Sequence, residues 1–272
     1  MSEATHRLDV ELVRRGLARS RGQARELVEA GSVLLDGSSA LKASTSVNEE
    51  QSLELASGVE GWVSRAAYKL AAAMEAFGPD GLSADNLRCF DVGACTGGFT
   101  QVLLRGGARE VVAVDVGHGQ LAEEIARDPR VIERSGINIR HARVEDLGGP
   151  AQLLVADLSF ISLRLVLPVL RDLVEATGDL VLLVKPQFEV GRELLGKGGI
   201  VRSAGNRAKA IEEVVAVARS VGLHTKALRG SPIRGATGNA EYLVWLTPRP
   251  HEGMTAGQVT ELAATLSSEA LT

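Results

Sequence analysis

The chain has 272 residues, of which 45% are hydrophobic and 24% are charged. These values are ordinary for a globular protein with a buried core, so they exclude a disordered chain, a collagen and a coiled coil. No apolar stretch approaches the length of a membrane-spanning helix, and the first residues are too polar for a secretory signal. The two cysteines, Cys89 and Cys95, provide neither a disulfide framework nor a metal-ligand cluster. We therefore expect a cytoplasmic protein with no bound metal and no membrane partner.

Basic residues are unevenly distributed along the chain. The formal net charge of −4 argues by itself against non-specific nucleic-acid binding. Between residues 7 and 25, however, six arginines stand against only two acids, Asp9 and Glu11. The six are Arg7, Arg14, Arg15, Arg19, Arg21 and Arg25. This cluster is compatible with a phosphate-binding surface and equally with a solvated helical face.

The same segment predicts a small domain of helices and a short strand. The helical spacing of Leu8, Leu12 and Val13 predicts a first helix that ends before Gly16. A capping box at residues 20–23 begins a second helix, and a short strand with an Asp-Gly turn follows. These elements predict an α+β module with arginines on its exposed side.

An acidic segment without periodicity, residues 45–61, indicates a domain boundary. After an alanine-rich helix that runs to about residue 77, apolar strands alternate with helices, which is typical of an α/β sheet. Strands are expected at residues 88–92, 110–115, 152–157, 180–185, 224–229 and 241–247, and helices at 100–105, 121–125, 163–176 and 206–221, with a last short helix in the tail. We predict a first domain over residues 1–60, a linker over 61–66 and a larger α/β domain over 67–272.

A glycine-containing loop joins the first strand of the sheet to a helix. Glycines in Asp-Val-Gly-Ala-Cys-Thr-Gly-Gly-Phe-Thr, residues 91–100, let the backbone turn sharply and approach a ligand closely. The spacing fits neither a dinucleotide fingerprint nor a P-loop. Asp115 ends the next strand, where a carboxylate can accept hydrogen bonds from both ribose hydroxyls of an adenosine group. This pattern favours S-adenosylmethionine as cofactor over a purely structural turn, with Asp91, Gly93, Ala94, Cys95, Thr96, Gly97, Gly98 and Asp115 as candidate binding residues.

Two lysines and two acids are expected to meet at one edge of the sheet. Asp157 and Lys185 end strands that lie one strand–helix–strand unit apart, so their ends should be neighbours. Lys69 lies in the helix before the sheet, and Glu241 begins the last strand. Each ammonium disfavours the charge of the other, so a neutral lysine could accept a proton from a ribose hydroxyl. Any of the four could instead be a surface ion-pair member, but a lysine that ends a buried apolar strand is costly without a role.

These motifs together resemble a known family. The order Lys69, Asp157, Lys185, Glu241 resembles the K-D-K-E tetrad of FtsJ-like ribose 2′-O-methyltransferases, and the arginine-rich start resembles an S4 RNA-binding domain. Further motifs are Asp-Leu-Ser-Phe-Ile-Ser (157–162), Lys-Pro-Gln-Phe-Glu-Val-Gly (185–191), Gly-Lys-Gly-Gly-Ile-Val (196–201) and Gly-Asn-Ala-Glu-Tyr (238–242). With them, the chain from about residue 7 to 247 resembles the TlyA family of bacterial rRNA methyltransferases, whose members are often called haemolysins.

The resemblance implies 2′-O-methylation of cytidine in 16S rRNA, 23S rRNA or both, with rRNA or ribosomal subunits as partners. It implies a Rossmann-like methyltransferase sheet preceded by an S4-like domain. By the same resemblance Lys185 acts as the base, Asp157 holds it, and Lys69 and Glu241 complete the crevice. Two further residues join the candidate sites, Asn138 for the cofactor and Arg65 for RNA.

Three other functions are less well supported. A membrane-lytic protein would need a spanning helix, a basic amphipathic helix with aromatic anchors, or an alternating barrel pattern, and the sequence has none of them. A methyltransferase acting on a protein or small molecule would leave the S4-like module and the two lysines without a phosphate-rich substrate. An RNA-binding module with an inactive site is disfavoured because all four tetrad positions are filled.

Overall fold

The computed structural model describes residues 5–18, 20–29, 31–40, 42–55 and 61–269. The chain divides into two compact units, Met1–Arg65 and Ala66–Thr272. Each unit has its own hydrophobic core.

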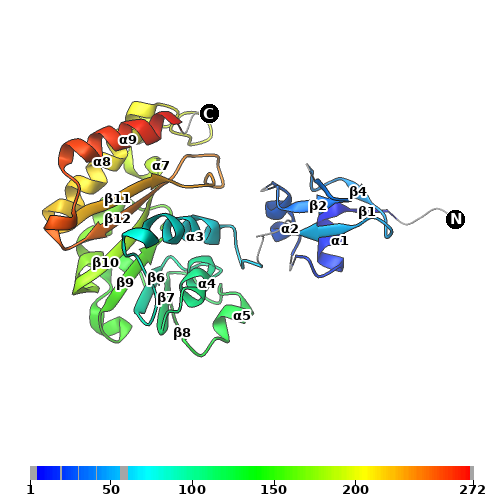
Figure 1. The fold of residues 1–272 in the computed structure, drawn as a ribbon, viewed down its shortest axis with the longest axis horizontal. Helices are drawn as coiled ribbons and strands as arrows, with labels where there is room; N and C mark the ends of the chain where they lie inside the picture. Colours follow the sequence, from blue (N-terminus) through cyan, green and yellow to red (C-terminus); the bar gives the residue numbers. More distant parts are fainter. Residues whose placement is uncertain (1–4, 19, 30, 41, 56–60, 270–272) are drawn as a thin grey trace. The chain divides into compact units, whose positions relative to one another are not determined.

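The N-terminal unit packs two helices against short antiparallel strands (Figure 1). The helices are α1 (Leu8–Arg14) and α2 (Arg21–Glu29), and the strands are β1 (His6–Arg7), β2 (Val33–Leu35), β3 (Ser38–Ser39), β4 (Ser46–Val47) and β5 (Leu53–Leu55). The strands form a three-stranded sheet in the order β3-β2-β5 and a separate β1-β4 pair. Leu8, Leu12, Ala24, Val28 and Val33 are buried in its core.

The interpretation of residues 45–61 as a boundary is wrong for its first part. β4 and β5 lie in this segment, and their residues Val47 and Leu53 belong to the core of the N-terminal unit. Strands of two or three residues are too short to produce a visible alternation of apolar and polar side chains. Their pairing partners lie far away in the sequence, so the local pattern carried no signal for them.

The C-terminal unit contains a seven-stranded sheet in the order β11-β12-β10-β9-β6-β7-β8. The strands are β6 (Arg88–Val92), β7 (Glu110–Asp115), β8 (Val131–Ser135), β9 (Ala151–Ala156), β10 (Val174–Val184), β11 (His224–Gly230) and β12 (Tyr242–Thr247). The helices are α3 (Ala66–Phe77), α4 (Gly98–Arg105), α5 (Glu123–Ala126), α6 (Leu163–Asp172), α7 (Pro186–Glu189), α8 (Ala204–Ser220) and α9 (Ala256–Glu269). Strands β8, β7, β6, β9 and β10 run parallel, whereas β12 is antiparallel to both of its neighbours. The chain builds outward from β6 in one direction and then returns to β9 on the other side, so a crevice opens between the carboxyl ends of β6 and β9.

Two details of this unit differ from the sequence prediction. The helix expected over residues 163–176 ends at Asp172, because Val174 pairs with Ala151 of β9 and begins β10. Strand β8 was not predicted at all. It lies at the edge of the sheet, where its two apolar residues are only partly buried, so its hydrophobic pattern is weak.

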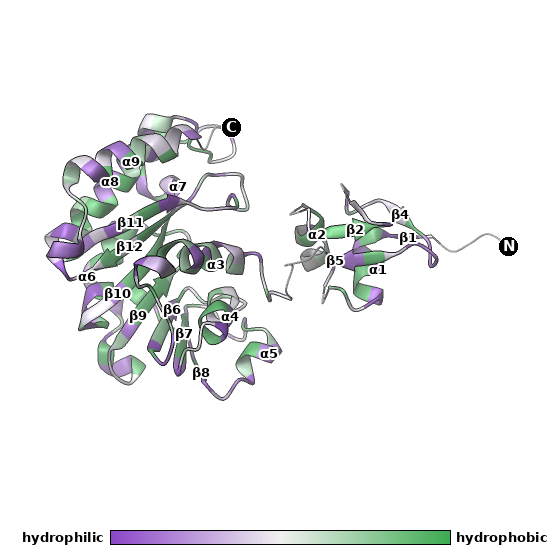
Figure 2. Cartoon of the chain, in the orientation of Figure 1, coloured by the Kyte–Doolittle hydropathy of each residue, from purple (hydrophilic) through white to green (hydrophobic). Residues whose placement is uncertain are grey.

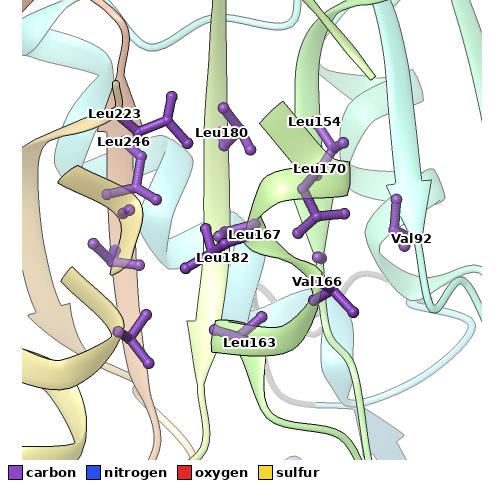
Figure 3. Close-up of a cluster of buried hydrophobic side chains, with 14 of the residues drawn as sticks. Val92, Leu154, Leu163, Val166, Leu167, Leu170, Leu180, Leu182, Leu223 and Leu246 are labelled. Atoms are coloured by element: carbon purple, nitrogen blue, oxygen red, sulfur yellow. The ribbon is translucent and has the colours of Figure 1, made fainter. Parts of the chain in front are cut away.

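Helices cover both faces of the sheet. Figure 3 shows α6 on one face, with Leu163, Val166, Leu167 and Leu170 directed at side chains of the strands. On the other face, Phe77 of α3 stacks on Trp245 of β12 with ring centroids 5.9 Å apart. The strands between these layers are predominantly hydrophobic (Figure 2), as expected for a parallel sheet buried on both faces.

Within the described residues, no helix combines the length and the apolar character that crossing a bilayer requires. The same residues contain no group of three or more His, Cys, Asp or Glu side chains arranged to hold a metal ion. Cys89 is buried and Cys95 is exposed, and both are free thiols.

A pair of leucines on α6 tests this packing. Leu167 is fully buried, whereas Leu165 is 57% exposed on the same helix. Leu167→Ala should lower the free energy of unfolding of the C-terminal unit by about 3 kcal/mol, because it removes buried apolar surface and leaves a cavity. Leu165→Ala should change it by less than about 0.5 kcal/mol. Urea unfolding of both variants measures the difference, and equal losses would contradict the assigned orientation of α6.

Candidate active site

A cavity of about 800 Å³ opens at the carboxyl edge of the parallel strands. Its walls are formed by the loops after β6, β7 and β9, by the turn after β8 and by Phe188 of α7. This is the position at which open α/β sheets bind their ligands, and the volume suits a nucleoside-sized molecule.

The loop after β6 has the tight geometry that its glycines predict. Gly93 and Gly97 have φ angles of 86° and 91°, a region that favours glycine. A Cβ atom at residue 93 would lie 2.8 Å from the carbonyl oxygen of Asp157, so any other residue would push the loops after β6 and β9 apart. Gly97 is buried, and a Cβ there would crowd Ile125 of α5 at 3.0 Å. Gly93 thus serves the close approach of two loops, and Gly97 serves helix packing.

The candidate cofactor residues fall into two groups. Gly93, Cys95, Asp115 and Asn138 line the cavity. The others, Asp91, Ala94, Thr96, Gly97 and Gly98, build the loop and the start of α4 but do not belong to the lining.

Asp115 and Asn138 are held in place by backbone groups. The two carboxylate oxygens of Asp115 accept hydrogen bonds from the backbone N–H groups of Cys95, at 2.9 Å, and Gly117, at 2.8 Å. The Asn138 side chain accepts a hydrogen bond from the backbone N–H of Arg140 at 3.1 Å and so caps a short turn. Both side chains therefore present fixed polar atoms to the cavity.

Asp91 is fully buried beneath the loop. Its Oδ2 accepts a 2.6 Å hydrogen bond from the Thr100 hydroxyl, while its Oδ1 has no hydrogen-bond partner. Burial raises the pKa of Asp91 to about 7, because the hydrogen bonds from Thr100 only partly offset the cost of desolvating the charge. An unpartnered buried carboxylate oxygen is unusual, and it adds to the cost of keeping this group charged.

The four residues of the predicted tetrad come together beside the cavity, and Asp157 is the one of them that belongs to its lining. Lys69 Nζ lies 3.1 Å from Asp157 Oδ2 and 2.7 Å from Glu241 Oε2. Lys185 Nζ lies 2.7 Å from Asp157 Oδ1. All four side chains are at most 12% exposed. Burial by itself raises the pKa of Asp157, but the two ammonium groups outweigh it and hold the pKa below its ordinary value, so this carboxylate stays ionised between them.

Two residues of the loop after β9 were not assigned a role from the sequence. Ser159 accepts a 2.8 Å hydrogen bond from Lys185 Nζ. Phe160 is 92% exposed at the cavity, has a φ angle of 63°, and its ring centroid lies 5.4 Å from that of Phe188. A large side chain in the left-handed region costs about 1–3 kcal/mol and is typically retained at functional sites. The motif at residues 157–162 was visible in the sequence, but only the backbone geometry shows that this ring faces solvent.

The arginines of the N-terminal unit surround two buried acids of α1. Arg7, Arg14, Arg15, Arg21 and Arg25 all form ion pairs with either Asp9 or Glu11. Four of these arginines are about half exposed, and Arg15 is 24% exposed. Arg65 is half-buried just before α3, and Arg19 lies outside the described residues.

Comparison with known proteins agrees with this geometry. Residues 62–247 match the family model of the FtsJ-like methyltransferases, and residues 6–53 match that of the S4 domain. The chain is 47% identical, over 92% of both chains, to the Mycobacterium tuberculosis protein named 16S/23S rRNA (cytidine-2′-O)-methyltransferase TlyA. The chain belongs to the TlyA family. The resemblance deduced from the motifs is thereby confirmed, as is the Rossmann-like methyltransferase fold with an N-terminal S4 domain.

Two other proteins to which the chain is similar carry haemolysin names. A Brachyspira hyodysenteriae protein named Hemolysin A is 34% identical over 87% of this chain and 98% of its own. A solved structure titled as a putative hemolysin from Streptococcus thermophilus is 36% identical and superposes with a TM-score of 0.75, covering 99% of this chain and 98% of its own. This likeness covers 99% of the chain and so includes both matched domains.

The buried charge of Asp91 makes a prediction about pH and stability. Because the pKa of Asp91 is raised in the folded state, its negative charge lowers the free energy of unfolding at high pH. This loss of stability is absent below about pH 4, grows between about pH 4 and 7, and is complete above pH 7. Asp91→Asn should therefore raise the melting temperature of the ligand-free protein at pH 8 by on the order of 5 °C, with little change at pH 4. Calorimetry at the two pH values measures this.

The exposed Asp85, exchanged for asparagine, serves as the control and should leave the melting temperature unchanged at both pH values. A destabilised Asp91→Asn protein at pH 8 would contradict the assigned burial cost.

Proposed function

We propose that this protein is an S-adenosylmethionine-dependent methyltransferase that methylates the ribose 2′-hydroxyl of a cytidine in 16S rRNA, 23S rRNA or both. The observation that carries the proposal is the buried contact of Asp157 with two lysines beside a nucleoside-sized cavity. The name of the Mycobacterium tuberculosis relative supports the substrate class.

The residues of the cavity fit S-adenosylmethionine. Asp115 ends β7 with a fixed carboxylate suited to ribose hydroxyls, and Gly93 permits close approach of the backbone. When bound, this cofactor supplies an electrophilic methyl group on a positively charged sulfur.

Lys185 is the residue best placed to accept the proton of the 2′-hydroxyl. Lys185 is one of the two ammonium groups beside Asp157 in the resting site, so it must first release a proton to solvent. The uncharged amine then has two N–H donors and one lone pair. Ser159 Oγ accepts a 2.8 Å hydrogen bond from Nζ, and Asp157 Oδ1 lies 2.7 Å away as its ion-pair partner, so the two neighbours hold the amine in place. Nζ would accept the proton that the 2′-hydroxyl loses as its oxygen is methylated, while the bound cofactor would give up the methyl group by cleavage of its carbon–sulfur bond. The ionised Asp157 would stabilise the resulting ammonium of Lys185. Lys69 and Glu241 hold the other side of that carboxylate in place.

Both units contribute to substrate capture in this proposal. The S4 unit supplies arginines for the phosphate backbone, and the exposed ring of Phe160 offers a flat apolar surface beside the cavity for a base. Residues 1–60 act as the RNA-binding domain and residues 67–272 as the methyltransferase domain in this proposal. Residues 61–66 are the linker between them, and Arg65 within this linker contacts RNA. RNA capture by phosphate contacts should weaken steeply with added salt.

The product identifies the function directly. Purified 30S and 50S subunits and naked rRNA are incubated with S-adenosylmethionine carrying a tritiated methyl group. We expect labelled rRNA in which the phosphodiester bond next to the labelled nucleotide resists alkaline cleavage, because methylation removes the 2′-hydroxyl that alkali requires. The label should be recovered as 2′-O-methylcytidine. Lys185→Ala should lower the rate by about 10²–10⁴-fold, because the base is lost, while cofactor binding is retained.

An exposed lysine of α8 provides the matched control. Lys209 is 67% exposed and pairs only weakly with Glu213 at 3.8 Å, so Lys209→Ala should keep the full rate. Full activity in Lys185→Ala would overturn the proposed mechanism. Label in protein, or in alkali-labile RNA, would overturn ribose methylation.

A further inference from the structure

The short helix α7 and the residue before it hold the loop after β9, residues 157–162, at two separate points. Lys185, which directly precedes α7, donates a 2.8 Å hydrogen bond to Ser159 Oγ in the middle of this loop. Glu189, the last residue of α7, contacts the opposite end of the loop. Phe160 therefore lies between two places where the loop is attached to the same turn of the chain.

The second attachment is a buried carboxylate that receives several donors. The Glu189 side chain is only 1% exposed. Its Oε1 accepts a hydrogen bond from the Leu163 backbone N–H at 2.7 Å, and its Oε2 accepts one from the Ser162 hydroxyl at 2.5 Å. Arg164 donates from Nε to Oε2 at 3.3 Å and from Nη2 to the carbonyl oxygen of Glu189 at 2.7 Å. Donors from the end of the loop and from the first turn of α6 thus converge on one residue of α7.

α6 also has a cap of its own at this end. The Ser162 hydroxyl accepts a hydrogen bond from the Arg164 backbone N–H at 3.2 Å, which is an ordinary local cap. Glu189 comes from 26 residues further along the chain. Burial raises the pKa of Glu189, and the hydrogen bonds from Ser162 and Leu163 and the charge of Arg164 offset this only in part. A costly buried acid from another helix therefore does more than cap α6, because it ties α7 to the end of the loop.

The backbone of Phe160 gives a reason for holding the loop twice. Its φ angle is 63° and its side chain is 92% exposed at the cavity. A large residue keeps such an angle only where the surrounding structure over-determines it. Lys185 fixes Ser159 on one side, and Glu189 fixes Ser162 on the other. Without the second attachment the backbone could relax to an ordinary angle, and the ring would leave its place at the cavity.

We propose that Glu189 is a positioning residue for methyl transfer, which acts by holding Phe160 where the acceptor nucleoside binds. The proposal rests on the proposed function, because it takes the exposed ring as the surface that receives the base. Glu189 does not belong to the cavity lining, so its effect on the reaction passes through the loop. It extends the site beyond the tetrad to an acid that touches none of the four tetrad side chains in the described contacts.

A double-mutant cycle with Phe160 tests this coupling. Glu189→Gln keeps the size of the side chain but replaces one acceptor oxygen with an NH₂ group, which cannot accept from Leu163 or Arg164. We expect kcat/KM for methyl transfer to rRNA to fall about tenfold in Glu189→Gln and about tenfold in Phe160→Ala. Because both changes remove the same surface, the double variant should also lose about tenfold, whereas independent effects would give about 100-fold.

Glu213 of α8 provides the matched control. It accepts a 2.7 Å hydrogen bond from Nη1 of the same Arg164, and its side chain is 37% exposed. Glu213→Gln removes the same charge beside the same arginine and should change kcat/KM less than about twofold. The melting temperature of every variant is measured as well. A purely structural role of Glu189 would lower the melting temperature and leave its kinetic effect independent of Phe160.

A second variant decides the matter if Glu189→Gln does not fold. Ser162→Ala removes one of the two hydrogen bonds at the end of the loop, so kcat/KM should fall about threefold, with no further loss when Phe160 is already alanine. Full activity of the folded variant, or losses that multiply with that of Phe160→Ala, would overturn this proposal alone. Absence of methyl transfer to rRNA by the unchanged protein would overturn the proposed function as well.

Discussion

One buried carboxylate, that of Asp157, lies between two lysine ammonium groups, and the four elements that meet at this edge of the sheet are arranged around this contact. Removing charges from water costs several kcal/mol per ion, so such a group persists only when every charge is paired. Here Lys69 bridges Asp157 and Glu241, while Lys185 meets the other oxygen of Asp157. Two cations and two anions balance, and loss of any one would leave a buried charge uncompensated. The pairing therefore fixes the position of the amine that we propose as base.

The fold supplies this contact from four separate elements. Lys69 comes from α3 on one face of the sheet, Asp157 and Lys185 follow β9 and β10, and Glu241 precedes β12. The loop after β9 is held from two sides. Glu189 of α7 accepts hydrogen bonds from the Ser162 hydroxyl and the Leu163 backbone at the start of α6. On the other side the loop lies so close to Gly93 that a Cβ atom there would meet the backbone carbonyl oxygen of Asp157 at 2.8 Å.

Much of the sheet could be predicted because its central strands are buried on both faces and so appear as continuous apolar runs. The polar residues that end them, Asp115 and Asp157, were identifiable for the same reason, since a charge directly after a buried strand is conspicuous. The burial of Asp9 was not predictable. In the sequence it is one acid among arginines, and only the packing of α1 against α2 places it beneath them. The exposure of Phe160 was hidden in the same way, because it depends on a backbone angle that no local pattern specifies.

The most direct test of the central claim exchanges the shared carboxylate for its neutral isostere. Asp157→Asn keeps the shape of the loop but cannot stabilise the ammonium of Lys185, so the single-turnover rate of methyl transfer to ribosomal subunits should fall by about 10²–10⁴-fold while cofactor affinity changes less than about threefold. Asp179→Asn, which breaks the Arg249 ion pair elsewhere on β10, should retain the full rate. An Asp157→Asn protein that transfers methyl groups as fast as the unchanged enzyme would contradict the account.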